Sequence, residues 1–262
     1  MGRIEEKLSS LKREKKKALV FFLTAGFPKL DSTEGIALAL ERGGADILEI
    51  GMPFSDPLAD GPAIQESSNI AIKNGVTLQS VLETARAIRA KSNIPLVLMG
   101  YLNPILRFGE KDFFSRAAKA GVDGIILPEL PYEETSRFKT LIDGSGLSQI
   151  LLVTPTTSPE RIRNIDAASN GFLYCVSTTG VTGSEHRANI GRYLDVVRKN
   201  ASKNPLLVGF GISTPLDAAS IAKSADGIII GSALIKRISS GVTPDDLAEW
   251  VRGFRRAIDT PC

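Results

Sequence analysis

The feature that most constrains the fold is an alternation, along the whole chain, of short apolar runs with segments of helical period. Each run has the length of one buried strand. Buried strands that alternate with helices form a parallel sheet, because each crossover helix lies over the sheet. Eight such units favour closure into a (β/α)8 barrel, or TIM barrel. The eight runs are residues 18–23, 46–50, 95–99, 124–127, 149–153, 171–176, 205–209 and 226–230.

Two additions to a plain barrel are predicted. Ile4, Leu8 and Leu11 recur at helical spacing among charged residues, which indicates an amphipathic helix over residues 3–16. Two helical patterns, 61–74 and 77–91, lie between the second and third strands, so one of them is extra. We therefore expect an α/β chain, residues 1–262, that forms a single TIM-barrel domain with an extra N-terminal helix and an extra helix after strand 2. An open, doubly wound sheet is the alternative that periodicity leaves open.

Several helix starts carry capping residues. Ser, Thr and Asp side chains accept hydrogen bonds from the free amides of a first turn, and Pro is favoured at the first helical position. On this basis we expect helices to be capped by Asp31, Thr77, Ser158, Thr214 and Thr243.

Composition excludes several classes of function. The net charge is +3, and the basic residues are dispersed except for 12–17, so binding to nucleic acid is not indicated. No stretch approaches the ~20 apolar residues of a membrane span, and the N-terminus has no apolar signal region. Cys175 and Cys262 are too few for a disulfide framework and lack metal-ligand spacing, which predicts a cytoplasmic protein without a bound metal.

Glu49 is the first candidate for chemistry. Side chains alternate along a strand, so Ile47, Glu49 and Gly51 share one face at the point where an apolar strand ends. A carboxyl group among apolar neighbours has a raised pKa and can hold or release a proton near neutral pH, as a general acid or base must. The alternative is a buried Glu neutralised by an Arg or Lys elsewhere.

Asp60 is the second candidate. It lies across a loop rich in Gly and Pro from Glu49, and it precedes Gly61-Pro62. This position leaves two interpretations open. The carboxylate could serve the reaction, or it could cap the helix that runs to Asn74.

Three glycine-bearing loops indicate a phosphate site. Residues 209–213 follow the seventh strand, residues 231–233 follow the eighth, and residues 179–183 follow the sixth. In a barrel the loops after strands 7 and 8 lie together, and free amides at helix N-termini bind anions there. One such turn alone would be an ordinary tight connection, whereas three on one rim favour phosphate.

The residue inventory limits the chemistry. Cleavage of a carbon–carbon bond commonly uses a Schiff-base Lys or a metal held by imidazoles as electron sink. The single histidine, His186, lies in a polar loop, no Lys lies on a predicted strand or at its end, and Lys236 falls inside a helix. Acid/base catalysis remains, on a substrate that carries its own electron sink.

The sequence motifs resemble those of the tryptophan synthase alpha family over nearly the whole chain. The loop from Glu49 to Gln65, with its sequence EIGMPFSDPLADGPAIQ, carries the most specific resemblance. The other matching blocks follow in the family's order: LMGYLNP at 98–104, PELP at 128–131, residues 177–183, residues 209–213, and Gly231-Ser232.

The resemblance implies a TIM barrel and a lyase of tryptophan biosynthesis, which cleaves indole-3-glycerol phosphate to indole and glyceraldehyde 3-phosphate. Glu49 would be the general acid/base, and Asp60 would stabilise charge on the indole nitrogen. From the residues themselves, which include glycines and charges and few apolar side chains, we expect the loop 179–191, with Thr182, to be mobile and to close over the substrate. The implied substrate-binding residues are Phe22, Leu98, Tyr101, Leu127, Val153, Tyr174 and Thr182, and the implied phosphate-binding residues are Gly183, Gly211, Ile212, Gly231 and Ser232.

The resemblance also implies a partner. Similar subunits dock on a pyridoxal-phosphate beta subunit, in an alpha2beta2 assembly, and no cofactor is expected in this chain itself. The loops 53–58 and 103–108 are the expected contact surface. Glu129, where the family usually has Asp, and Gly100, where a larger residue is common, depart from the pattern. Another phosphate-binding barrel enzyme, or a silent regulatory subunit, are the competing interpretations, and neither explains both Glu49 and Asp60.

Overall fold

The structure, a computed structural model, describes residues 2–176, 184–209 and 211–259, without the side chains of residues 184–189. Its parallel strands close into a barrel in chain order, which confirms the TIM barrel and excludes the open sheet. The predicted runs coincide with the strands, within two residues at each end. The strands are β1 Ala18–Thr24, β2 Ile47–Gly51, β3 Leu96–Met99, β4 Gly124–Ile126, β5 Ser148–Val153, β6 Leu173–Val176, β7 Leu206–Gly209 and β8 Gly227–Ile230.

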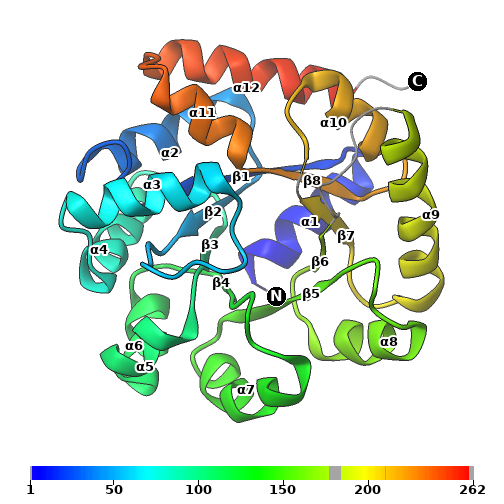
Figure 1. Cartoon of the computed structure of the whole chain (residues 1–262), viewed down its shortest axis with the longest axis horizontal. Coiled ribbons are helices and arrows are strands. Elements are labelled where there is room, and N and C mark those ends of the chain that lie inside the picture. The colour runs from blue at the N-terminus through cyan, green and yellow to red at the C-terminus, as the bar shows by residue number, and fades with distance from the viewer. Residues whose placement is uncertain (1, 177–183, 210, 260–262) are drawn as a thin grey trace.

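Helices form a ring around the strands (Figure 1). Their bounds are α1 Arg3–Arg13, α2 Ser32–Gly43, α3 Pro62–Lys73, α4 Leu78–Arg89, α5 Leu102–Phe108, α6 Glu110–Lys119, α7 Thr135–Gly144, α8 Pro159–Ala168, α9 Ser184–Asn200, α10 Pro215–Ala222, α11 Ser232–Ser239 and α12 Pro244–Asp259, and a 3-10 turn, η1, spans Tyr132–Glu134.

Both predicted additions are present, as α1 and as the α3–α4 pair between β2 and β3. One further helix, α5, was not predicted as a separate element, whereas α12 begins directly after the predicted cap Thr243. Gly109 separates α5 from α6 because its backbone has φ 98, a conformation that favours glycine. The α3 insertion and the α5 insertion follow neighbouring strands, so both extend the same rim of the barrel.

The leading helix α1 covers the amino-terminal end of the barrel. Its apolar face, formed by Ile4, Leu8 and Leu11, is buried. Ile4 packs closely against the backbone of Gly124, where even a Cβ would come within 3.0 Å of its Cδ1. Burial of each such side chain stabilises the fold by about 1.5–3 kcal/mol. Arg3 adds an ion pair with Asp123, with its Nη1 2.9 Å from the carboxylate.

Four of the five predicted helix caps are confirmed. The hydroxyls of Thr77, Ser158, Thr214 and Thr243 each accept a hydrogen bond from the backbone three residues later. The prediction that the Asp31 side chain caps a helix is wrong, since its carboxylate accepts no such hydrogen bond. Its backbone already has helical angles, φ −95 and ψ −2, whereas a capping side chain needs an extended backbone to reach the amides.

The predicted loop 179–191 is shorter than expected, because residues from Ser184 onward belong to α9. Buried Ile190, Leu194 and Val197 give this helix its inner face. No Pro or Gly interrupts the chain between Ser184 and Ile190, so the helix extends toward its N-terminus. Thr182 and Gly183 lie outside the described residues.

None of the helices in the described part of the chain combines the length and apolarity needed to cross a bilayer. Within the same residues, no three His, Cys, Asp or Glu side chains are grouped so that they could hold a metal ion.

Candidate active site

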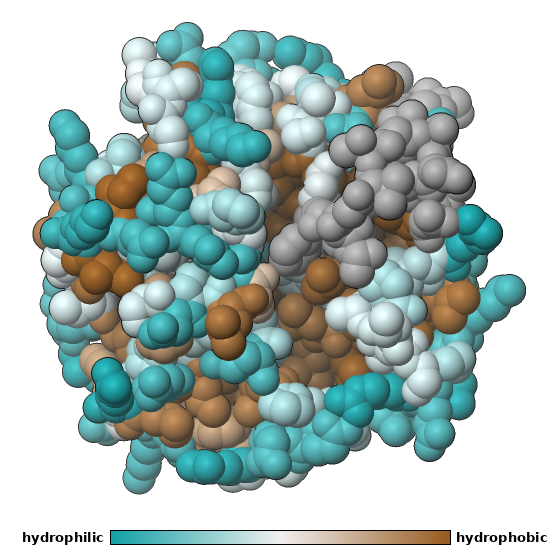
Figure 2. Space-filling view, in the orientation of Figure 1, coloured by the Kyte–Doolittle hydropathy of each residue, from teal (hydrophilic) through white to brown (hydrophobic). Residues whose placement is uncertain are grey.

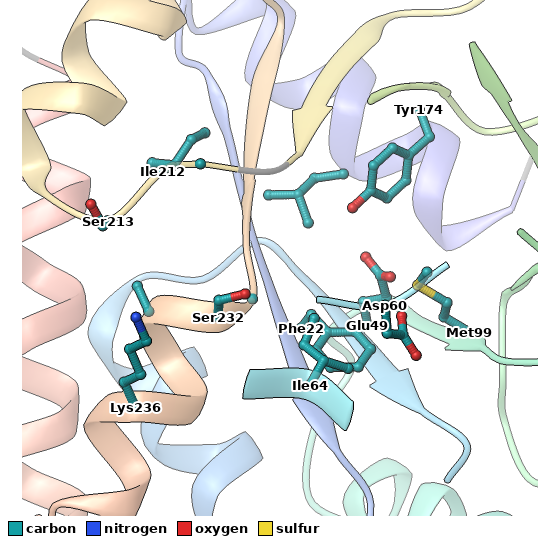
Figure 3. Close-up of a pocket in the computed structure, with 14 residues that line it drawn as sticks. Phe22, Glu49, Asp60, Ile64, Met99, Tyr174, Ile212, Ser213, Ser232 and Lys236 are labelled. Atoms are coloured by element: carbon teal, nitrogen blue, oxygen red, sulfur yellow. The ribbon is translucent and has the colours of Figure 1, made fainter. Parts of the chain in front are cut away.

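A pocket of about 270 Å³ lies at the carboxyl ends of the strands. Apolar side chains gather around a hollow near the centre of this face (Figure 2). Acidic residues lie at one side of the pocket, and the loops after β7 and β8 lie at the other (Figure 3). Its lining consists of Phe22, Glu49, Asp60, Ile64, Met99, Tyr174, Gly211, Ile212, Ser213, Ile229, Gly231, Ser232, Ala233 and Lys236.

Glu49 projects from β2 into this pocket. It is only 1% exposed, and both of its carboxyl oxygens are buried without a hydrogen-bond partner among the described residues. The alternative of a Glu neutralised by Arg or Lys therefore finds no support. Burial, together with the negative charge of Asp60, raises the pKa of Glu49 to about 8. The group is thus protonated at neutral pH and can donate a proton.

Asp60 does not cap α3. The N-cap position belongs to Gly61, which has no side chain, so the capping interpretation of Asp60 is wrong. The carboxylate lines the pocket instead. The pKa of Asp60 is raised to about 6: burial and the charge of Glu129 raise it, and a hydrogen bond from Tyr101 partly opposes them. At neutral pH Asp60 is mostly ionised.

Tyr101 contacts both the Asp60 side chain and the loop that carries it. Its ring packs against Phe54, with the two centroids 5.3 Å apart. Its hydroxyl accepts a hydrogen bond from the amide of Ala59 at 3.0 Å, and it also donates to the Asp60 carboxylate. Tyr101, which was predicted to bind the substrate, is not among the residues that line the pocket. Its contacts with Phe54 and Ala59 instead hold in place the loop that carries Asp60.

The opposite end of the pocket is made of backbone and small residues. Gly211, Ile212 and Ser213 follow β7, and Gly231 and Ser232 open α11. Gly211 has φ 76, a conformation that glycine adopts without strain. The first amides of a helix have no intrahelical partner and favour anions, so this end suits a phosphate group. The structure brings together four of the five predicted phosphate-binding residues, and Gly183 lies outside the described residues.

The predicted apolar lining is brought together in part. Phe22 and Tyr174 line the pocket, whereas Leu98, Leu127 and Val153 do not. Strand register explains the difference for β3. Glu49 pairs with Val97 and Gly51 pairs with Met99, so Val97 and Met99 share the face of Glu49, and Leu98 lies on the opposite face with Ile50.

The same register extends around the barrel. Met99 pairs with Ile126, the last residue of β4 before Leu127. Leu152 pairs with Tyr174, so it shares the inner face, whereas Val153 pairs with Cys175 and its carbonyl accepts a hydrogen bond from Tyr193 of α9. Each of the three predictions is one residue from a position on the inner face.

Comparison with known proteins identifies the family of the chain. Residues 8–254 match the family model for the tryptophan synthase alpha chain. The chain belongs to this family. The tryptophan synthase alpha chain of Geotalea daltonii is 49% identical over 239 residues, which cover 90% of each chain. That of Geobacter sulfurreducens is 45% identical over 263 residues, which cover 98% of this chain and 99% of the relative.

Solved structures show the same relationship. The alpha subunit of tryptophan synthase from Legionella pneumophila superposes with a TM-score of 0.91 at 39% identity and covers 99% of each chain. A tryptophan synthase chain from Mycobacterium tuberculosis superposes with a TM-score of 0.89 at 30% identity, covering 98% of this chain. The tryptophan synthase alpha family is a family of lyases that cleave indole-3-glycerol phosphate.

The two departures from the tryptophan synthase alpha pattern have structural explanations. A Cβ at Gly100 would lie 2.8 Å from both the Cβ and the Cε of Met52, so the Met52 side chain fills the space of a larger residue. Glu129 accepts a hydrogen bond from the amide of Leu102 at the start of α5. Its charge also acts on Asp60.

Sequence reasoning missed six residues of the pocket: Ile64, Met99, Ser213, Ile229, Ala233 and Lys236. A signal existed for three of them. Ser213 and Ala233 belong to glycine-bearing loops already recognised as an anion site, and Lys236 lies one helical turn after Ala233. Met99 and Ile229 follow from the register between strands, which no feature of the sequence specifies.

Proposed function

We propose that this chain catalyses the reaction of its family, the retro-aldol cleavage of indole-3-glycerol phosphate to indole and glyceraldehyde 3-phosphate. The observation that carries this proposal is the buried Glu49 carboxyl group, which has no hydrogen-bond partner among the described residues, in a pocket that holds an ionised Asp60 and an anion-binding end. We also propose that residues 1–262 act as a single domain, since one barrel supplies all the described residues of the site.

Glu49 is the general acid and base. It delivers a proton to carbon 3 of the indole ring, which turns the ring into an electron sink. The bond between carbon 3 and the glycerol chain then breaks, its electron pair returns to the ring, and the neighbouring hydroxyl loses a proton to become an aldehyde. One proton enters and one leaves, so a single carboxyl group with a pKa near the working pH can serve both steps.

Asp60 stabilises the positive charge that develops at the indole nitrogen. Its carboxylate is ionised when Glu49 is protonated, because the two pKa values are about 6 and about 8. Tyr101 keeps the carboxylate ionised through its hydrogen bond and fixes the loop through Ala59. Fixed charge of this kind acts without reorganisation when the reaction occurs.

The substrate lies between the two ends of the pocket. Phe22, Tyr174 and Met99 offer apolar surface to the indole ring, and the amides at the start of α11 hold the phosphate. Thr182 and Gly183 belong to the same proposal, as residues of a loop that closes over the substrate.

We further propose that the chain works with a beta subunit that binds pyridoxal phosphate, in an alpha2beta2 assembly in the cytoplasm, and that it needs no cofactor of its own. Phe54 of the loop 53–58 packs against Tyr101, the residue before helix α5, so the two expected contact segments adjoin. Leu58 is 93% exposed and Leu106 is 43% exposed, which suits a surface that a partner covers.

The test is direct. Purified chain is incubated with indole-3-glycerol phosphate, alone and with a tryptophan synthase beta subunit, and indole is measured. We expect indole from the wild type, faster with the beta subunit. Activity should persist after chelation and after borohydride treatment with substrate. Absence of indole in both mixtures would overturn the proposal, and inactivation by borohydride would indicate a Schiff base instead.

A further inference from the structure

Lys236 is a charged residue of the pocket for which the proposed reaction has no role. Among the described residues that line the pocket, it is the one cationic side chain. The other charged groups of this lining are the carboxyl groups of Glu49 and Asp60. It lies on the far side of the pocket from them, and its side chain runs back along α11 toward Ser232 (Figure 3). The pocket therefore has an acidic end and a cationic end.

Helix geometry places Lys236 at the cationic end. In α11, Lys236 follows Ser232 by four residues and Ala233 by three, so all three share one face of the helix. Side chains on a helix point back toward its N-terminus. The ammonium group of Lys236 is thus directed at the helix start, where the free amides lie.

Among the described residues, Lys236 has no acidic partner that explains its position. It makes no hydrogen bond or ion pair with the residues that the structure describes. It is exposed, so keeping its charge there costs little desolvation. The ordinary alternative is that it stabilises α11 by its place in the last turn of this short helix. That alternative predicts a loss of stability on substitution and no change in anion binding.

We propose that Lys236 is the cation that binds the phosphate dianion of the substrate above the N-terminus of α11. This inference rests on the proposed function. The helix amides fix the orientation of the phosphate, and the ammonium group supplies the charge that lets the pocket prefer a phosphorylated substrate to an uncharged one. A flexible lysine suits this position because its point charge can follow the anion as it enters.

The experiment compares Lys236→Gln, Lys236→Arg and a control, Lys223→Gln, in the full chain. Lys223 is also exposed, but it follows α10 at that helix's carboxyl end, away from the pocket. Its substitution removes the same charge and leaves the pocket unchanged. Binding of glycerol 3-phosphate is measured by calorimetry, which needs no turnover, and kcat and KM are measured with indole-3-glycerol phosphate.

For Lys236→Gln we expect the dissociation constant of glycerol 3-phosphate to rise about fivefold to twentyfold, between the effects of an exposed ion pair and of a charged hydrogen bond. KM should rise by a similar factor and more than kcat falls, while affinity for indole and the melting temperature stay close to wild type. Lys236→Arg should keep most of the affinity. Added salt should weaken binding to the wild type more than binding to Lys236→Gln.

Unchanged affinity for glycerol 3-phosphate in Lys236→Gln would overturn the inference, as would a wild type that does not bind this anion. A fall in melting temperature with unchanged affinity would assign Lys236 to helix stability and likewise overturn it. A wild type that binds glycerol 3-phosphate but forms no indole would contradict the proposed reaction instead, and the binding measurements would still decide the role of Lys236.

Discussion

The carboxyl groups of Glu49 and Asp60 face one pocket and titrate in different ranges. The charge of Asp60 adds to the effect of burial on Glu49 and brings its pKa to about 8. The hydrogen bond from Tyr101 counteracts the burial of Asp60, whose pKa is about 6. Between these values the pocket holds one proton donor and one anion, which is the arrangement that acid/base cleavage of an indole requires.

The first prediction is a bell-shaped pH dependence of kcat/KM. Activity should rise through about pH 6 as Asp60 ionises, and it should fall through about pH 8 as Glu49 loses its proton. Steady-state rates with indole-3-glycerol phosphate between pH 5 and 9 test this. In Tyr101→Phe the acidic limb should move to higher pH, because the bond that lowers the pKa of Asp60 is lost. A flat profile in the wild type would contradict the assignment of both groups.

The second prediction is that Glu49→Gln removes activity and stabilises the chain at alkaline pH. A general acid contributes about 10²–10⁴ to rate, so a loss of at least that size is expected. The folded pKa of Glu49, about 8, lies above its ordinary value of 4.5. The folded state therefore binds more protons between these values, and its free energy of unfolding falls as pH rises through this window, by up to about 5 kcal/mol. The amide side chain of Glu49→Gln does not ionise, so the variant does not lose this stability as pH rises.

Thermal unfolding of the wild type and Glu49→Gln at pH 5 and pH 8.5 measures the effect. The variant should gain more over wild type at pH 8.5 than at pH 5. Glu6→Gln is the matched control, since Glu6 is an exposed residue of α1, and its two differences should be equal. An equal gain at both pH values for Glu49→Gln would mean that its carboxyl group is not buried in a protonated form.

The third prediction separates two neighbours on β3. Leu98 and Met99 are both buried, but the pocket includes Met99 alone. Leu98→Ala should lower the free energy of unfolding by about 2–5 kcal/mol and leave KM of the folded enzyme unchanged. Met99→Ala should also destabilise, and it should raise KM as well, because it removes surface from the substrate site. Urea unfolding and steady-state kinetics on the two variants distinguish these results, and equal KM values would place neither side chain against the substrate.

The pair Leu98 and Met99 also shows how far sequence reasoning reached. The alternation of apolar runs predicted the barrel, because each buried strand can be recognised from residues that are neighbours in the chain. The face of Glu49 was predicted correctly for the same reason. The choice between Leu98 and Met99 depends on the register of β3 against β2, and a shift of one residue moves every side chain to the other face. Register comes from packing of the whole barrel, so the predictions at Leu98, Leu127 and Val153 each missed the inner face by one residue.

Long-range contacts account for the remaining differences. Asp60 before Gly61-Pro62 has the sequence of a helix cap, and only the folded loop shows that its carboxylate lines the pocket, within reach of Tyr101. Gly100 departs from the family pattern because Met52, distant in sequence, fills the same space. The type of catalytic group and the local backbone conformation can be predicted from neighbours in the chain. The contacts of Asp60 with Tyr101 and of Gly100 with Met52 depend on how loops distant in sequence fold against each other.

The last prediction concerns Gly209, at the end of β7, and Tyr174 beside it on β6. A Cβ at position 209 would lie 2.3 Å from the Tyr174 hydroxyl oxygen and 2.6 Å from the ring, well inside van der Waals contact. In Gly209→Ala the ring must move, and it lines the pocket, so the shift reduces the space for the substrate. We expect a destabilisation of about 1–3 kcal/mol from overpacking and a rise in KM of at least about tenfold.

A second substitution identifies the cause. Tyr174→Val removes the ring that collides with the new methyl group, so adding Gly209→Ala to Tyr174→Val should cost much less stability than adding it to the wild type, a non-additivity expected of residues in contact. Gly144→Ala, at the end of α7 with no atom within 4 Å of its Cβ position, is the control and should leave stability and KM near wild type. Denaturant unfolding and kinetics on the four variants give the coupling. Additive effects of Gly209→Ala and Tyr174→Val would show that the ring does not depend on the space that Gly209 provides.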